Sequence, residues 1–298
     1  MKNAIALLIT VVFVMIISVA IGYGLMQVKE ASKVVENEKV LYQSSMLLDD
    51  ILAILAASPE LQSLADSNSS DDLYLFLANS RYLPLEIANA KIVISFESAN
   101  ARLNINSMNK ENEALFREYF SRYMVGSSYV DILKECMRKN QAKDEYNNYT
   151  SALFDEYPEL FGEYIASKEH LDIINTFYQQ EYGDTNLKNI RFDELFSYAL
   201  QINTVVDLNY AKPAVWELIL GTSRERAESL YQAAGVYRTV NDLHLSELEK
   251  KNMAKFQTTF FAPYLLVTVE IIRDESSSKI RFTYDIKSKK GYDFVFEV

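Results

Sequence analysis

The chain has 298 residues, 49% of them hydrophobic and 24% charged, so it can bury a substantial core and is not a disordered chain. Its formal net charge of −11 argues against the phosphate backbone of nucleic acids as the main partner, because that affinity comes mostly from lysine and arginine. The lone Cys136 excludes an internal disulfide and the cysteine pairs of a zinc site.

The N-terminal stretch Ala4–Met26 carries no charged residue and is long enough to cross a bilayer as one helix. Lys2 and the terminal amine precede it, so the positive-inside rule places the amino end in the cytoplasm. A cleaved secretory signal is the alternative, because Ser18-Val19-Ala20 offers small residues to signal peptidase. The apolar run continues past Ala20, and we therefore expect a membrane-spanning helix.

Beyond Met26 the pattern of one amphipathic helix continues to about Ala57. Its apolar residues recur at spacings of three, four and seven, which is typical of a single buried face. Ser58-Pro59 is expected to end this helix, because proline lacks a backbone donor and restrains the residue before it. A further helix is expected at Asp71–Ala78.

Strand patterns bracket a helical block. Residues 89–107 alternate polar and apolar side chains around a small-residue turn and predict a β-hairpin. Residues 108–255 are predicted to be almost wholly helical. Three strands joined by two turns then follow, at 263–274, 279–288 and 292–298 with turns at 275–278 and 289–291. Strands on both sides of the block must share one sheet, so the block is an insertion.

The predicted fold class is therefore α+β: a long N-terminal helix packs on a small antiparallel sheet, as in pilin-like proteins, and an all-α domain of SAM-like or helix-hairpin-helix-like type is inserted. The expected domains are an N-terminal transmembrane helix, a pilin-like domain at 27–107 and 256–298, and an inserted helical domain at 108–255.

Three separated stretches carry a family resemblance. Ala4 followed by IALLITVVFVMI looks like a prepilin leader junction, SANARLNINSM at 98–108 contains the polar pair Asn104 and Asn106, and a helical segment at 202–232 contains Asp207, Asn209 and Gly221. Together they resemble the K-type minor pseudopilins of the bacterial type II secretion system, also termed general secretion pathway protein K. KNIRFDELFSY at 188–198 looks like its counterpart in that family.

The resemblance implies how the N-terminus is processed and where the subunit sits. Prepilin peptidase would cut between Ala4 and Ile5, although the family usually has glycine before the cut. Residues 1–4 would then be the leader, residues 5–26 the transmembrane and assembly helix, and the pilin-like domain would be periplasmic. The fifth mature position is then Ile9, where most pilin-like subunits carry a glutamate that neutralises a neighbour's terminal amine within the apolar helix bundle. Its absence implies a position at the filament tip, where no subunit lies above.

The resemblance also implies partners and location: other minor pseudopilins in a tip complex that primes the filament, and the bacterial inner membrane, crossed once, with the C-terminal domain in the periplasm. No nucleic acid is expected as a partner. A minor pilin of a type IV pilus would share this architecture and is a second possibility.

A third possibility is a membrane-anchored DNA receptor, since two helices joined at Leu220-Gly221-Thr222-Ser223 look like a helix-hairpin-helix module. Such modules bind the DNA backbone through main-chain amides beside basic side chains. Residues 204–249 carry four basic and seven acidic side chains, which favours protein packing over DNA binding.

Catalytic and metal-binding patterns are weak. His170 and His244 lie far apart without a serine or cysteine partner at recognisable spacing, so we expect surface or capping residues and no enzyme. Some members of the family bind calcium. Four acidic pairs raise that possibility here, but none has the spacing of a calcium loop, so solvated carboxylates and no cofactor are expected: Asp49-Asp50, Asp71-Asp72, Asp144-Glu145 and Asp274-Glu275.

Overall fold

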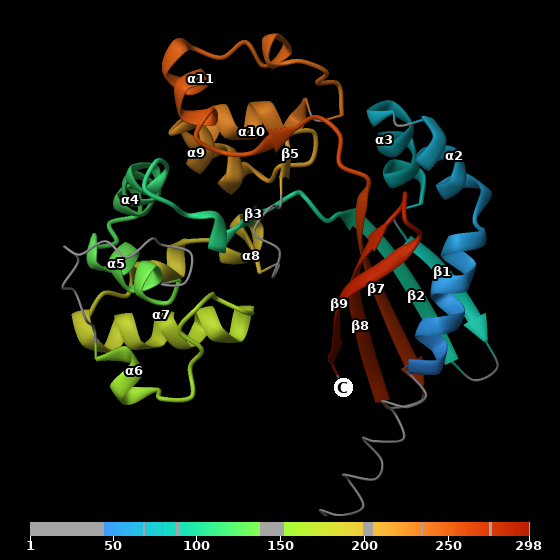
Figure 1. The fold of residues 1–298 in the computed structure, drawn as a ribbon, viewed down its shortest axis with the longest axis horizontal. Coiled ribbons are helices and arrows are strands. Elements are labelled where there is room, and N and C mark those ends of the chain that lie inside the picture. The colour runs from blue at the N-terminus through green and yellow to red at the C-terminus, as the bar shows by residue number, and fades with distance from the viewer. Residues whose placement is uncertain are drawn as a thin grey trace, which may run out of the picture.

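The computed structural model describes residues 45–67, 69–80, 82–87, 90–137, 152–198, 205–233, 235–273 and 276–297. These residues form two parts, each built around its own hydrophobic core. We term them the sheet part, residues 45–98 and 263–297, and the helical part, residues 99–262. Figure 1 shows them side by side, the helical part in green to orange and the sheet part with its blue helices.

The sheet part is built on a five-stranded antiparallel sheet in the order β1-β2-β7-β8-β9. Its strands are β1 Tyr82–Ile87, β2 Ala90–Ser98, β7 Tyr264–Arg273, β8 Ser276–Asp285 and β9 Lys290–Glu297. The three predicted C-terminal strands are confirmed. The turn predicted at 275–278 is wrong for Ser276–Ser278, because these serines extend the ladder and pair with β7.

Helices cover one face of this sheet. Residues 45–57 are helical, and α2 Pro59–Ser67 and α3 Ser70–Asn79 follow. Leu48, Ile51 and Leu55 lie on one side of the first helix and pack in the same core as alternate residues of β2 and β7. Pro59 is the first residue of α2, which confirms the predicted break at this proline.

The hairpin predicted at 89–107 is wrong. β2 pairs with β1 and β7, and the residues after it leave the sheet. Leu103–Asn104 form the short strand β3 and Ile105–Ser107 a 3₁₀ turn, all within or beside the helical core. The alternating pattern misled because Asn104 and Asn106, polar by type, are both buried.

The helical part is mainly helical, but less completely than the predicted 'almost wholly helical' block, because irregular segments such as 157–167 and short two-residue strands separate its helices. Its helices are α4 Glu113–Arg122, α5 Ser128–Glu135, α6 Leu153–Glu156, α7 Lys168–Tyr182, α8 Phe192–Leu195, α9 Pro213–Leu220, α10 Arg224–Gln232 and α11 Glu247–Met253, with 3₁₀ turns η3 Asn186–Asn189 and η4 Val240–Leu243. The short strands pair in parallel, β3 with β4 Phe196–Ser197 and β5 Val206–Asp207 with β6 Thr258–Thr259.

Among the described residues, no helix has the length and apolar character needed to cross a membrane. The predicted membrane-spanning stretch Ala4–Met26, with Ala4, Ile5 and Ile9, lies outside the described residues.

Candidate functional site: a buried polar junction

The chain crosses between the two parts at two places, residues 99–103 on the way out and 257–263 on the way back. A third segment, residues 205–212, forms hydrogen bonds with both crossings. Asp207 N–H donates to Asn100 O over 2.9 Å and Leu208 N–H to Thr259 O over 2.8 Å. Lys212 N–H donates to Ala101 O over 3.1 Å. We term these three segments the polar junction, because buried polar side chains hold them together.

Asp207 ties the returning crossing to the third segment. Its Oδ1 accepts Asn209 N–H at 3.0 Å and its Oδ2 accepts Ala262 N–H at 2.8 Å. The side chain is fully buried, and desolvation raises the pKa of Asp207 to about 7 even though both backbone bonds favour the carboxylate. Because both oxygens are occupied by backbone donors in a closed interior, Asp207 is placed to hold the chain and not to transfer protons to a ligand.

Asn209 binds two distant loops at once. Its Nδ2 donates to Tyr237 O at 2.9 Å and to Phe260 O at 2.8 Å. Its Oδ1 accepts Gly235 N–H at 3.1 Å and Tyr237 N–H at 3.0 Å. The fully buried amide therefore uses two donor and two acceptor positions, which makes it a cross-link between the loop after α10 and the returning crossing.

Asn104 and Asn106 repeat this arrangement just after the outgoing crossing. Asn104 Oδ1 accepts Asn106 N–H at 3.1 Å, as Asp207 accepts the amide two residues on. Asn106 then reaches a distant loop, donating to Ile165 O at 3.0 Å and accepting Ile165 N–H at 2.8 Å. In each motif the first residue, Asn104 or Asp207, forms an Asx turn. The asparagine two positions later then hydrogen-bonds a segment that is distant in the sequence.

Gly221, the fifth of the motif residues, lies outside the polar junction, at the C-terminus of α9. Its φ is +66°, and a Cβ there would lie 2.9 Å from Asn252 Nδ2, which donates to Leu220 O at 2.9 Å. The position therefore needs glycine both for its backbone conformation and for its space.

We expect Gly221→Ala to lower the free energy of unfolding by about 2 kcal/mol, because alanine is strained at this φ and also displaces Asn252. Gly183→Ala is the matched control: Gly183 has φ +64° with no atom within 4 Å of an added Cβ, so only the backbone cost of about 1 kcal/mol applies. Urea unfolding followed by fluorescence of Trp216, the chain's single tryptophan, measures both. Equal losses would contradict the steric part of the argument.

The hairpin around Gly221 is held by hydrogen bonds within the fold. Gly221 N–H and Thr222 N–H both donate to Glu217 O, and the Arg122 guanidinium donates to the carbonyls of Gly221 and Thr222. Two main-chain amides of the hairpin, those of Gly221 and Thr222, are thus engaged within the fold and are not free to bind phosphate. This geometry favours packing over DNA binding.

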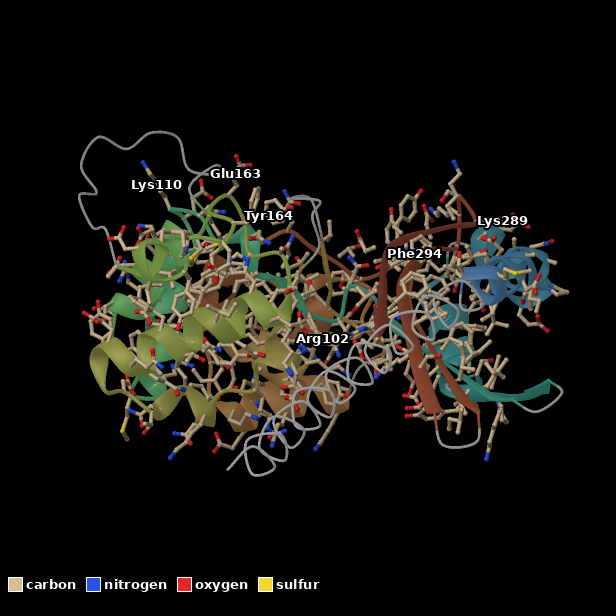
Figure 2. The ribbon with its side chains drawn as sticks, turned by 90° about the horizontal axis from the view of Figure 1, so that it is seen from below. Arg102, Lys110, Glu163, Tyr164, Lys289 and Phe294 are labelled. Atoms are coloured by element: carbon tan, nitrogen blue, oxygen red, sulfur yellow. The ribbon has the colours of Figure 1, made fainter. Side chains whose placement is uncertain are left out.

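Charged side chains line a hollow of about 510 Å³ between α8, α9 and α10. Three of its four basic groups, all except Lys212, have partners among the described residues. Arg191 bonds Glu194 at 2.8 Å, and Arg224 bonds Glu228 at 2.8 Å and buried Glu217 at 3.2 Å. Arg102, which lies between the two parts in Figure 2, donates to Asp193 O at 2.6 Å. The hollow therefore presents paired charges of both signs.

The remaining sequence candidates are placed as follows. His170 is buried, so it is not a surface residue; its Nδ1 accepts Ala166 N–H at 3.3 Å just before α7, as a capping residue would, and desolvation lowers its pKa. His244 is the residue that ends η4, as a capping residue would be. Within the described residues no three His, Cys, Asp or Glu side chains could together hold a metal ion. Asp144-Glu145 and Asp274-Glu275 lie outside those residues.

The structure thus places Asp207 and Asn209 together in the polar junction. Asn104 and Asn106 form a similar motif just after the outgoing crossing. Sequence reasoning missed Asn100, whose Nδ2 donates to Val205 O at 2.6 Å, and Asn252 beneath Gly221. Asn100 stands in the same quoted stretch SANARLNINSM as Asn104 and Asn106, and that was the available signal. Nothing local marked Asn252.

The class of fold is now defined: α+β, with helices on one face of a small antiparallel sheet and a large helical part inserted between two neighbouring strands, β2 and β7. A chain of the GspK-GspI-GspJ complex from the type 2 secretion system of enterotoxigenic Escherichia coli shares this fold, with a TM-score of 0.57 and 12% sequence identity. The likeness covers 88% of this chain and 99% of that one.

The resemblance to K-type minor pseudopilins is confirmed at the level of the fold, through a complex that contains GspK. No protein-family model matches the chain. No curated protein matches it either.

Proposed function

We propose that this protein is a minor pseudopilin of a type II secretion system and acts without enzymatic chemistry. The observation that carries the proposal is that the likeness spans both parts, the pilin-like sheet and the helical insertion, in a chain of the GspK-GspI-GspJ complex. In this proposal residues 108–255 are an inserted domain, and the protein works through its surfaces, with other minor pseudopilins as partners.

The finer points of the proposal concern the N-terminus. Cleavage between Ala4 and Ile5, anchoring of Ile5–Met26 in the inner membrane, and a tip position marked by Ile9 follow from the sequence resemblance. In this role the protein would join a tip complex and prime the filament, with the described residues in the periplasm. The internal hydrogen bonds of the hairpin at Gly221 support this role over DNA uptake.

Strand β9 carries a run of exposed apolar side chains. It lies at one edge of the sheet, and Tyr292, Phe294, Val295 and Phe296 are each 37% to 45% exposed. An edge strand has unpaired backbone groups, and exposed aromatics are typical of interface centres. We propose that the β9 surface contacts a neighbouring pseudopilin.

The test is co-purification of the chain with the minor pseudopilins encoded in its own bacterium. We expect the wild type to form a complex and Val295→Asp to weaken it by about tenfold or more, since the change puts a charge in an apolar contact. Val295 faces Arg281 across the ladder, so an aspartate there is compatible with folding. Phe161→Asp, at a side chain 46% exposed on the helical part, is the control and should keep full binding.

Failure of the wild-type chain to bind any minor pseudopilin would overturn the function. Equal binding by both variants would leave the function standing and exclude β9 as its surface. A complex with type IV pilins instead would assign the same architecture to the other machine.

A further inference from the structure

The two parts also touch at a second place, next to the polar junction. Asp71 in α3 of the sheet part forms an ion pair with Arg238 in the loop between α10 and η4 of the helical part. Arg238 is held in place on its own side, because its Nη1 donates to Gly235 O at 3.1 Å and to Tyr237 O at 3.0 Å. Figure 1 shows α3 on the side of the sheet part that adjoins the orange helical segments.

Tyr74, one helical turn after Asp71, lies directly against the same loop. A Cβ built on Gly235 would fall 2.3 Å from the Tyr74 ring, and Gly235 has a φ of +88°. Only glycine therefore allows the ring to approach the backbone this closely in this conformation. We term Asp71, Tyr74, Gly235 and Arg238 the α3 contact.

The α3 contact connects the two cores. On one side, Leu73 is fully buried in the core of the sheet part, next to Tyr74 in α3. On the other, Gly235 N–H and Tyr237 N–H both donate to Asn209, the centre of the polar junction. A change in the α3 contact therefore changes how the helical part sits on the sheet part.

The contact is nevertheless weak. The side chains of Arg238 and Asp71 are 41% and 63% exposed, and exposed ion pairs contribute little stability. Tyr210, which packs against the core of the sheet part, has a buried hydroxyl with no hydrogen-bond partner among the described residues. If the α3 contact opens, water can reach this hydroxyl. The closed arrangement therefore carries the free-energy cost of a buried hydroxyl without a hydrogen bond, and opening removes that cost.

We propose that the α3 contact is a reversible latch: when it is closed it fixes the orientation of the helical part on the sheet part, and when it opens the helical part swings about the two chain crossings. Because the ion pair is weak and the Tyr210 hydroxyl has no hydrogen bond, the closed and open states differ little in free energy. A binding partner can therefore shift their populations. This inference concerns the free protein and does not depend on the secretion role.

The experiment measures the distance between the parts by electron-spin resonance on the full chain in detergent micelles. Spin labels are placed on exposed positions of each part through Glu181→Cys in α7 and Lys287→Cys after β8. Cys136 is buried and stays unlabelled. We expect one dominant distance for the closed form, with a minor population at other distances. Arg238→Glu should cause loss of the dominant distance, since it sets like charges against each other.

Two further variants keep the result interpretable. The charge swap Asp71→Arg with Arg238→Asp restores an opposite pair and should restore the dominant distance, which a merely misfolded loop would not do. Lys250→Glu breaks an exposed pair with Glu247 inside α11 and should leave the distances unchanged. The latch is excluded if Arg238→Glu keeps the wild-type distances, or if the swap fails to restore them while Trp216 fluorescence shows that the helical part is folded.

Discussion

Asn209→Ala is expected to lower the free energy of unfolding by about 4 kcal/mol, because it removes four buried hydrogen bonds worth about 1 kcal/mol each. The loss is large because the groups that remain are main-chain atoms of Gly235, Tyr237 and Phe260, which stay buried and cannot all find water. Urea unfolding of fragment 45–298, followed by Trp216 fluorescence, measures it. Trp216 is buried and lies 6.4 Å from the Tyr237 ring, so it reports on this region.

Two comparisons separate the hydrogen bonds from the side chain itself. Asn209→Asp keeps the acceptor oxygen but loses both donors and sets a carboxylate against the carbonyls of Tyr237 and Phe260, so it should be at least as damaging as alanine. Asn189→Ala, at an exposed asparagine, should change stability by less than about 0.5 kcal/mol. A loss below about 1 kcal/mol for Asn209→Ala would mean that the loops are held by other contacts.

The sheet part was the more predictable half, because burial on one face leaves a period in the sequence. The spacing of Leu48, Ile51 and Leu55 predicted a helix with one buried face, and all three pack in the core of the sheet part. The strand predicted at 263–274 is β7, and its alternate residues Leu265, Val267, Val269 and Ile271 face that core. These patterns depend only on neighbours within one element.

The polar junction was not predictable in the same way, because its asparagines are polar residues in buried positions. Asn104 and Asn106 gave an alternating pattern that predicted a strand, although both are buried. Asp207 and Asn209 were selected by resemblance alone. Their partners Gly235, Phe260 and Ala262 lie far along the chain, and only the fold brings them together.

Lowering the pH from 8 to 5 is expected to stabilise the protein through Asp207, opposite to the effect of an acid that is paired in the native state. Burial raises the pKa of Asp207 to about 7 in the folded chain, against 3.8 for an exposed aspartate. Between these values the folded state holds a proton that the unfolded state has released. The stabilisation is therefore complete below about pH 4 and is lost as the pH rises through 7, by at most about 4 kcal/mol in total.

Asp207→Asn isolates this contribution. The amide does not titrate, so the difference in stability between wild type and variant should change by up to about 1.4 kcal/mol per pH unit between pH 5 and 7. At pH 5 the variant should be the less stable, because its NH₂ group meets a backbone N–H where a carboxyl oxygen accepted one. At pH 8 the deficit should vanish or reverse, since the wild type then buries a charge.

The effect of His170 on stability has the opposite sign. Burial lowers its pKa, so the unfolded state binds a proton at a higher pH than the folded state, and the protein loses stability as the pH falls. Its contribution is the same in wild type and variant and cancels in their difference, which is why the difference and not the wild-type curve is the quantity to measure. Asp155→Asn, at an exposed carboxylate of α6, should show no such pH-dependent difference. If Asp207→Asn follows the wild-type curve in parallel from pH 5 to 8, Asp207 is ionised throughout, and its two backbone hydrogen bonds outweigh its burial.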